Sequence, residues 1–322
     1  MNQNDIALKK TALCVGVALL IFLALFYGAF AVLEFIISPI VYKILGNTLG
    51  GVISKLLTGV VYAAVFILPA LIFKRINPSE HKKSGLAPAF PLDLAPFIIM
   101  ATVALSISCS YVNSWLGTAI GASSSTPSTE ITTPLDFILL TFTTAIVPAV
   151  CEEFLFRKTI ENALLPYSES FAIISSALMF GLMHQNVWQI FYATMAGIVL
   201  GYIYARTRSY LCVFLIHFTN NFISVIQTAM LGNLREPYVT IAISTLMAAV
   251  ILLGAISAII LILKEKNKKD AYSTGSFGKI LFPSEGFVQN KTSRAPSKIF
   301  FLSPSVLIFI IISVLICASQ LL

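Results

Sequence analysis

The segment 147-VPAVCEEFLFRK-158 places Glu152, Glu153, Arg157 and Lys158 at the end of an apolar run that begins near residue 135. A run of about 20 apolar residues is the length that an α-helix needs to cross the hydrocarbon core of a bilayer. Each ionisable side chain inside such a helix costs on the order of 2.5–3.5 kcal/mol, and it usually faces a cavity or a partner. The segment therefore predicts a membrane-spanning helix that carries a polar site.

The rest of the chain has the same apolar character. Of its 322 residues, 57% are hydrophobic and only 11% are charged, whereas ordinary soluble domains carry about 25% charged residues. Further apolar runs recur along the whole sequence, and with the first they lie near 11–38, 50–73, 94–116, 135–155, 169–186, 188–205, 209–231, 238–263 and 299–321. We therefore expect an all-α protein, a polytopic transmembrane helical bundle of about eight or nine spans.

The net charge of +7 reports orientation and not a nucleic-acid partner. If the N-terminus is cytoplasmic and nine spans alternate, all 21 Lys and Arg except Lys43, Lys55 and Arg235 lie on the cytoplasmic side. This asymmetry is the positive-inside pattern. The first apolar run continues to Ile40, too far for a signal-peptide core, which favours an uncleaved first helix. We expect an integral protein of a bacterial-type cytoplasmic membrane, with the lipid bilayer as a partner.

Composition divides the chain into three parts. Residues 1–134 form a scaffold of about three spans that ends in a polar external loop, 117–134. Residues 135–230 carry most of the intramembrane polar side chains in spans four to seven, and we expect the chemistry there. Residues 231–322 hold the last spans and a basic, Ser- and Gly-containing cytoplasmic linker, 264–298, before a solitary anchor.

The adjacent glutamates have different neighbours on a helix. Glu153 and Arg157 are four residues apart, so they share one face at ion-pair distance and neutralise each other. Glu152 points about 100° away from Glu153 and cannot use the same arginine equally well. This leaves Glu152 as a candidate general base, although the motif by itself also fits a residue that marks the membrane surface.

Two histidines accompany this carboxylate inside the membrane. His184 closes the fifth span, and His217 lies in the seventh with Asn221 one turn later. Glu152 is 14 residues before Pro166 and His184 is 18 after it, so both lie roughly 20–27 Å from the turn between their helices. A lone intramembrane histidine often serves only as a hydrogen bond between helices. A carboxylate, two imidazoles and an amide on nearby helices favour one shared site.

Three motifs, Glu152-Glu153-x-x-x-Arg157, Phe180-x-x-x-His184 and His217-x-x-x-Asn221, resemble in order and membrane context those of a known peptidase family. This is the CAAX prenyl endopeptidase type II and bacteriocin-processing (CPBP, Abi) family of intramembrane proteases. The resemblance covers roughly residues 135–230. It implies an endopeptidase that acts on a prenylated protein or a bacteriocin-type peptide.

The resemblance also implies a role for each residue. Glu152 and His184 would hold and deprotonate the attacking water, while His217 and Asn221 would donate hydrogen bonds to the oxyanion. Glu153 and Arg157 would support the helix and tune Glu152. We expect no cofactor; the alternative is zinc, for which Glu152, His184 and His217 could supply three ligands.

Two functions of other classes remain open at this point. A transporter or channel could use the same Glu and His residues as a proton path, but it would need polar residues from one membrane face to the other. A bacteriocin immunity protein could bind a toxin without cleaving it. Only a measured activity distinguishes this protein from a protease.

Overall fold

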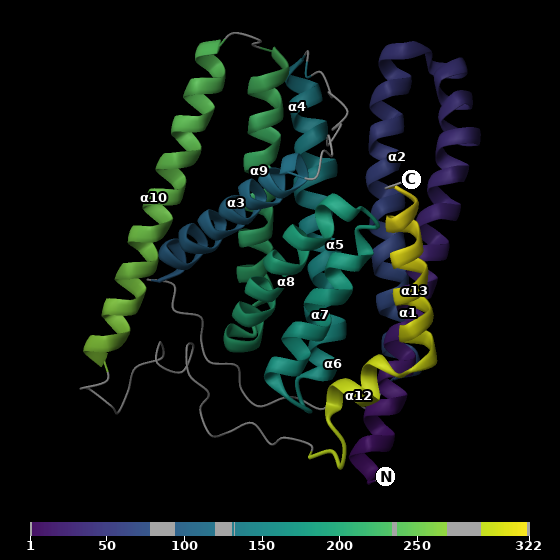
Figure 1. Ribbon diagram of the computed structural model, residues 1–322. Coiled ribbons are helices and arrows are strands. Elements are labelled where there is room, and N and C mark those ends of the chain that lie inside the picture. The colour runs from purple at the N-terminus through teal and green to yellow at the C-terminus, as the bar shows by residue number, and fades with distance from the viewer. Residues whose placement is uncertain are drawn as a thin grey trace.

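The computed structural model describes residues 2–77, 94–119, 131, 133–233, 237–268 and 291–320 (Figure 1). Within these ranges the chain forms helices and no strand, which confirms the all-α class. Among the described residues, six helical segments are long and apolar enough to cross a membrane, and two apolar helices are shorter. The protein is therefore a polytopic helical membrane protein, and the expected number of eight or nine spans is approximate.

The first two expected spans are almost one continuous helical run. The run consists of helix α1 (Gln3–Val32), the π-helical turn η1 (Leu33–Ile37) and helix α2 (Ser38–Ile76), with no loop between them. Together they form one helical segment of 74 residues. Gly46 interrupts it with φ 73° and ψ 176°, a conformation that glycine adopts without steric cost. The chain reverses there, and α1 and α2 pack side by side (Figure 1).

The remaining elements follow in chain order. They are α3 (Ala95–Ala119), α4 (Pro134–Leu140), η3 (Thr141–Ile146), α5 (Val147–Leu155), η4 (Phe156–Glu161), α6 (Asn162–Leu164), α7 (Glu169–Met183), α8 (Val187–Thr207), α9 (Tyr210–Asn233), α10 (Pro237–Lys268), α12 (Pro296–Phe301) and α13 (Pro304–Ser319). Each apolar run of the sequence is thus helical. Most of the external loop and of the cytoplasmic linker lies outside the described residues.

Helices α7 and α8 form a tight hairpin. A Cβ atom on Gly181 would lie 2.0 Å from Thr194 Oγ1, and one on Gly197 would lie 3.1 Å from the Ala177 Cα and Cβ atoms, so glycine permits the close approach. Helix α7 has 15 residues, about 22 Å at 1.5 Å per residue, which is shorter than the hydrocarbon core. The helix in the expected span 169–186 is therefore shorter than predicted and ends at Met183. The hairpin tip, with His184, ends inside the bundle.

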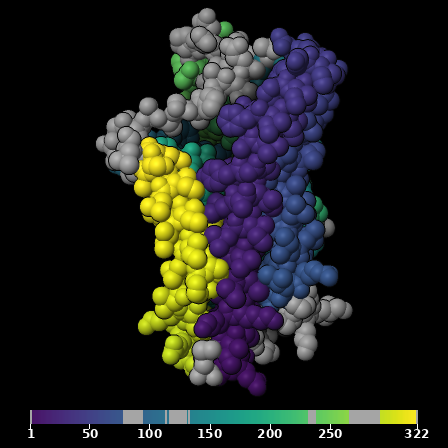
Figure 2. All heavy atoms as spheres, turned by 90° about the vertical axis from the view of Figure 1, so that its right-hand side faces the viewer, coloured from purple at the N-terminus to yellow at the C-terminus, as the bar shows by residue number. Residues whose placement is uncertain are grey.

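The sequence suggested that the C-terminal helix is a solitary anchor, but in the structure this helix packs against other helices. Helix α13 packs along α1 and also contacts α7, and Figure 2 shows it beside α1 on one face of the molecule. Gly16 of α1 allows this contact, because a Cβ there would lie 2.3 Å from Ser305 Oγ. The hydroxyl of Ser305 donates a hydrogen bond to the Leu13 carbonyl at 3.0 Å.

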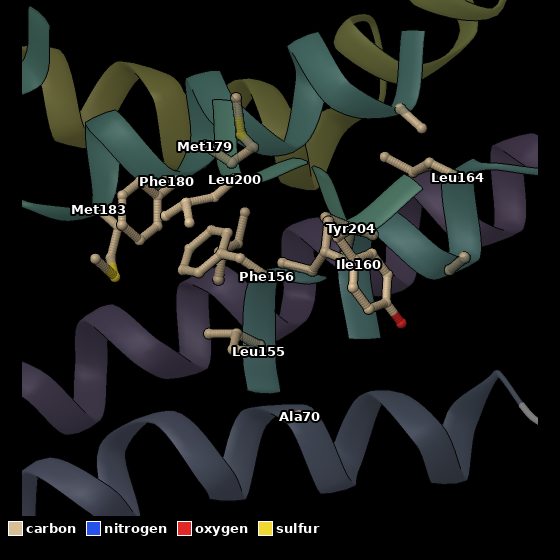
Figure 3. Packing of buried hydrophobic residues seen from close by; sticks show 14 of the residues in the cluster. Ala70, Leu155, Phe156, Ile160, Leu164, Met179, Phe180, Met183, Leu200 and Tyr204 are labelled. Carbon is tan, nitrogen blue, oxygen red and sulfur yellow. The ribbon is translucent and has the colours of Figure 1, made fainter. Parts of the chain in front are cut away.

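The apolar core continues around the polar segment. Phe156 and Phe180 are buried and meet edge to face, with ring centroids 5.2 Å apart (Figure 3). Leu155 is buried between α5 and α2, near Ala70. This packing fixes the rotation of α5 about its axis, and with it the directions of the two glutamates that α5 carries.

Candidate active site

The four expected catalytic side chains line one cavity. Glu152 comes from α5, His184 from the end of α7, and His217 and Asn221 from α9. The other lining residues are Ser106, Phe180, Tyr192, Ala193, Ala196, Val199, Leu200, Ile216 and Asn220. The cavity has a volume of about 80 Å³, which is room for a few water molecules. Polar groups from three helices thus converge on a small, mainly apolar hollow.

The adjacent glutamates have separate surroundings. Glu152 is 3% exposed and lines the cavity. Its Oε1 accepts a hydrogen bond from the Tyr62 hydroxyl of α2, while Oε2 has no hydrogen-bond partner among the described residues. Glu153 is fully buried and does not line the cavity. Glu152 is therefore the carboxylate with an oxygen available for chemistry.

Glu153 joins a histidine to an arginine. Its Oε1 lies 2.8 Å from His217 Nδ1, and its Oε2 lies 3.0 Å from Arg157 Nε. The Glu153–Arg157 pair fits the spacing argument, but the contact with His217 was not expected. Because a carboxylate accepts, Nδ1 of His217 carries the hydrogen. The other ring nitrogen, Nε2, lies 3.9 Å from Glu152 Oε2.

Arg157 is a buried cation that several groups surround. Its side chain is 0% exposed, its NH1 donates to Ser176 Oγ at 3.3 Å, and its guanidinium lies 5.0 Å from the centre of the Phe180 ring. Glu161 is a second, more distant carboxylate, with Oε2 3.9 Å from Arg157 Nε. A buried charge of this kind persists only when it is paired. The network fixes Glu153 and, through it, the ring of His217.

His184 has a defined tautomer. Its Nδ1 lies 2.9 Å from the Phe180 carbonyl oxygen, and since a carbonyl only accepts, Nδ1 carries the hydrogen and the neutral ring keeps an accepting Nε2. The Phe180 ring meets both imidazoles edge to face, with centroids 5.0 Å from His184 and 6.1 Å from His217. Phe180 therefore separates the histidines and fixes both rings.

The hairpin tip that carries His184 is held by the C-terminal helix. Gln185 has φ 50°, in the left-handed region, which turns the chain between α7 and α8. Its Nε2 donates to Ser313 Oγ of α13 at 2.8 Å, and Gln320 Nε2 donates to the Gln185 carbonyl at 2.7 Å. Two segments separated by more than a hundred residues thus position one imidazole.

Asn221 uses a carbonyl that a proline leaves available. Pro148 has no N–H to donate to the Thr144 carbonyl one turn earlier, and the preceding turn, η3, is π-helical. The Asn221 Nδ2 donates to that carbonyl at 3.2 Å. The amide has a second hydrogen for a ligand. Pro148 therefore leaves free the acceptor that orients Asn221.

In the ranges that the structure describes, no three His, Cys, Asp or Glu side chains are arranged to hold a metal ion. Each of the two histidines bonds to the protein through Nδ1, so Nε2 of each ring stays available for another partner. The zinc alternative stays a prediction, and the chemistry below is derived from the side chains of the chain.

Sequence reasoning did not identify Tyr62 or Tyr192 as part of the site. Tyr62 lies 90 residues before Glu152 on helix α2, and no spacing connects the two. Asn220, the neighbour of Asn221 on α9, also lines the cavity. Its Nδ2 lies 2.5 Å from the Tyr192 hydroxyl oxygen.

Comparison with known proteins agrees with the motifs. Residues 134–223 match the family described as type II CAAX prenyl endopeptidase Rce1-like. No curated protein and no solved structure matches the chain. The matched segment runs from the start of α4 into α9 and contains Glu152, His184, His217 and Asn221. Helices long enough to cross a membrane and this match together support, at the level of the family, a CAAX-type intramembrane protease. Over residues 134–223, less than a third of its length, the chain is thus similar to the type II CAAX prenyl endopeptidase Rce1-like family.

Proposed function

We propose that the protein is a glutamate-type intramembrane endopeptidase that hydrolyses a peptide bond in a membrane-associated substrate. The observation that carries this proposal is the convergence of Glu152, His184, His217 and Asn221 on one cavity. A base, a proton partner and two donors are the groups that hydrolysis of an amide requires. Glu152 and His217 are buried, and low exposure to water strengthens the electrostatic contacts that they make.

The first step uses the free oxygen of Glu152. A water in the cavity donates one hydrogen bond to Glu152 Oε2 and the other to Nε2 of His184. As the water oxygen attacks the scissile carbonyl carbon, Glu152 accepts the proton. The Tyr62 hydroxyl, bonded to Oε1, holds the carboxylate so that Oε2 remains directed at the cavity. General base catalysis of this kind typically contributes about 10²–10⁴-fold.

The carbonyl oxygen becomes an oxyanion in the tetrahedral intermediate. Asn221 donates its second Nδ2 hydrogen to it, and His217 donates from Nε2 in its doubly protonated form, with Nδ1–H still bonded to Glu153. The C–N bond then breaks, and the leaving amine takes the proton that Glu152 accepted. The products are a carboxylic acid and an amine, which exchange a proton to become a carboxylate and an ammonium ion, and Glu152 returns to its ionised state.

Substrate class and orientation are part of the proposal. The family match favours a prenylated protein tail, and a bacteriocin-type peptide is the alternative from the wider family. The distribution of Lys and Arg favours a cytoplasmic N-terminus in a bacterial-type cytoplasmic membrane. Lys74 and Lys158 lie over the same Phe154 ring, 4.2 and 5.6 Å from its centre. The two segments that carry these lysines, both expected to be cytoplasmic, are therefore at the same depth in the bundle.

Purified protein in nanodiscs, incubated with a panel of farnesylated and leader-type peptides, tests the proposal. Wild type should cleave at least one peptide at a single bond, and Glu152→Gln and His184→Ala should not. Glu169→Gln is the matched control, because this carboxylate pairs with Arg206 outside the cavity. We expect a chelator to leave the rate unchanged.

Other outcomes favour other functions. If no peptide is cleaved but Glu152→Gln abolishes proton or solute flux in liposomes, the transporter is supported and the protease is rejected. If cells tolerate a toxin equally well with wild type and Glu152→Gln while no cleavage occurs, a binding role is supported.

A further inference from the structure

A second cavity adjoins the candidate active site. It has a volume of about 220 Å³ and is lined by Ile107, Ser110, Tyr111, Ser114, Tyr192, Asn220, Ile223, Ser224 and Gln227. Tyr192 and Asn220 line both cavities. The two spaces therefore meet at these side chains, and the second extends away from the catalytic groups between α3 and α9.

Hydroxyl and amide groups recur along both helices at helical spacing. On α3, Ser106, Ser110 and Ser114 are four residues apart, which places them on one face. Ser106 lines the first cavity and the other two line the second. On α9, Asn220 is followed by Ser224 and Gln227, four and seven residues later. Two polar faces on two apolar spans thus border a common space.

A polar ligand in the second cavity would explain why α3 and α9 carry these polar faces. Polar side chains within membrane spans usually face the bundle interior or a cavity, and they mark a substrate path. Each side chain that lines the second cavity is uncharged. Neutral hydroxyls and amides both donate and accept, which matches the N–H and C=O groups of a peptide main chain. They match an anion or a cation less well.

The junction connects this space to the reacting groups. Asn220 Nδ2 lies 2.5 Å from the Tyr192 hydroxyl oxygen and 3.3 Å from Asn221 Oδ1. Asn221 is a candidate oxyanion donor. A peptide that places its scissile carbonyl at Asn221 therefore brings its neighbouring residues to Asn220 and Tyr192. An extended chain advances about 3.3–3.6 Å per residue, so the next residues enter the second cavity.

We propose that the second cavity, bordered by Ser110, Ser114, Ser224 and Gln227, is a subsite that binds the polar main chain of the substrate beside the scissile bond. The inference rests on the proposed function, because it assigns the substrate of that site. The first cavity, with walls of Val199, Leu200 and Ile216, then holds the reacting bond and its apolar neighbour.

Equilibrium binding tests the subsite without cleavage. In a Glu152→Gln background, the Kd of a fluorescent farnesylated peptide is compared with that of the same peptide lacking its polar extension. Gln227→Leu and Ser110→Ala should each weaken binding of the long peptide by about 2- to 12-fold, the range for one lost hydrogen bond. The short peptide should bind as before. Thr228→Val and Ser108→Ala are neighbouring controls that do not line the cavity.

The outcomes separate the two proposals. Suppose that wild type cleaves the peptide, but that the lining variants bind each of the two peptides with the same Kd as the control variants do. The subsite is then rejected and the protease stands. If nothing is cleaved but binding of the long peptide depends on Gln227 and Ser110, the catalytic function is rejected and the second cavity is supported only as a peptide-binding site. If the long peptide does not bind at all, the subsite is also rejected. Should Gln227→Leu fail to fold, Ser110→Ala, which removes a single oxygen, decides.

Discussion

Glu153 and Arg157 are both 0% exposed and form a 3.0 Å ion pair inside the bundle. Removing one partner of a buried pair typically costs about 3–5 kcal/mol, because the other charge remains uncompensated, while replacing both by neutral groups is often tolerated. We therefore expect Glu153→Gln to lower the free energy of unfolding by about 3–5 kcal/mol. The double variant Glu153→Gln/Arg157→Met should recover much of this loss.

The assay is a double-mutant cycle, with equilibrium unfolding in mixed detergent micelles for wild type, both single variants and the double variant. The structure predicts a coupling free energy of about 2–3 kcal/mol, the upper part of the range for residues in one network. Glu169 and Arg206, 2.8 Å apart but with 19% and 11% of their side chains exposed, are the control pair. Their coupling should stay below about 1 kcal/mol. Additive effects at Glu153 and Arg157 would refute the assignment of Glu153 as a structural bridge.

Three further changes test other parts of the account. Tyr62→Phe removes the hydroxyl that donates to Glu152, so kcat should fall about 10- to 100-fold with KM little changed; an unchanged kcat would remove Tyr62 from the site. Ser313→Ala removes the hydrogen bond to Gln185, and steady-state kinetics should show a several-fold lower kcat while the Tm falls only slightly. Gly181→Ala places a Cβ 2.0 Å from a hydroxyl on α8 and should cost about 1–3 kcal/mol in unfolding experiments; wild-type stability would contradict the tight hairpin.

Local physical rules predicted much of the fold from the sequence. Runs of apolar residues predict helices directly, because lipid leaves the backbone no other partner than itself. The lengths of the helices were harder to predict from the sequence. The run 169–186 reads as a span, yet its helix ends at Met183, because Gln185 turns the chain and hydrogen bonds to α13 hold that turn. A contact between segments so far apart leaves no periodic signal.

The same limit applies to the candidate site. The i,i+4 rule predicted the Glu153–Arg157 pair, and the three motifs supplied the candidate catalytic residues. Neither rule reveals that Glu153 also bonds to His217, or that Tyr62 bonds to Glu152. Those contacts depend on how α2, α5 and α9 rotate against one another. Packing of whole helices determines that rotation.

The central claim concerns one carboxylate. The most direct test measures the cleavage rate of one farnesylated peptide by equal amounts of folded wild type, Glu152→Gln and Glu169→Gln in nanodiscs of the same lipid. We predict that wild type and Glu169→Gln cleave at the same rate and that Glu152→Gln is slower by at least about 10²-fold. Equal rates for wild type and Glu152→Gln would contradict the account.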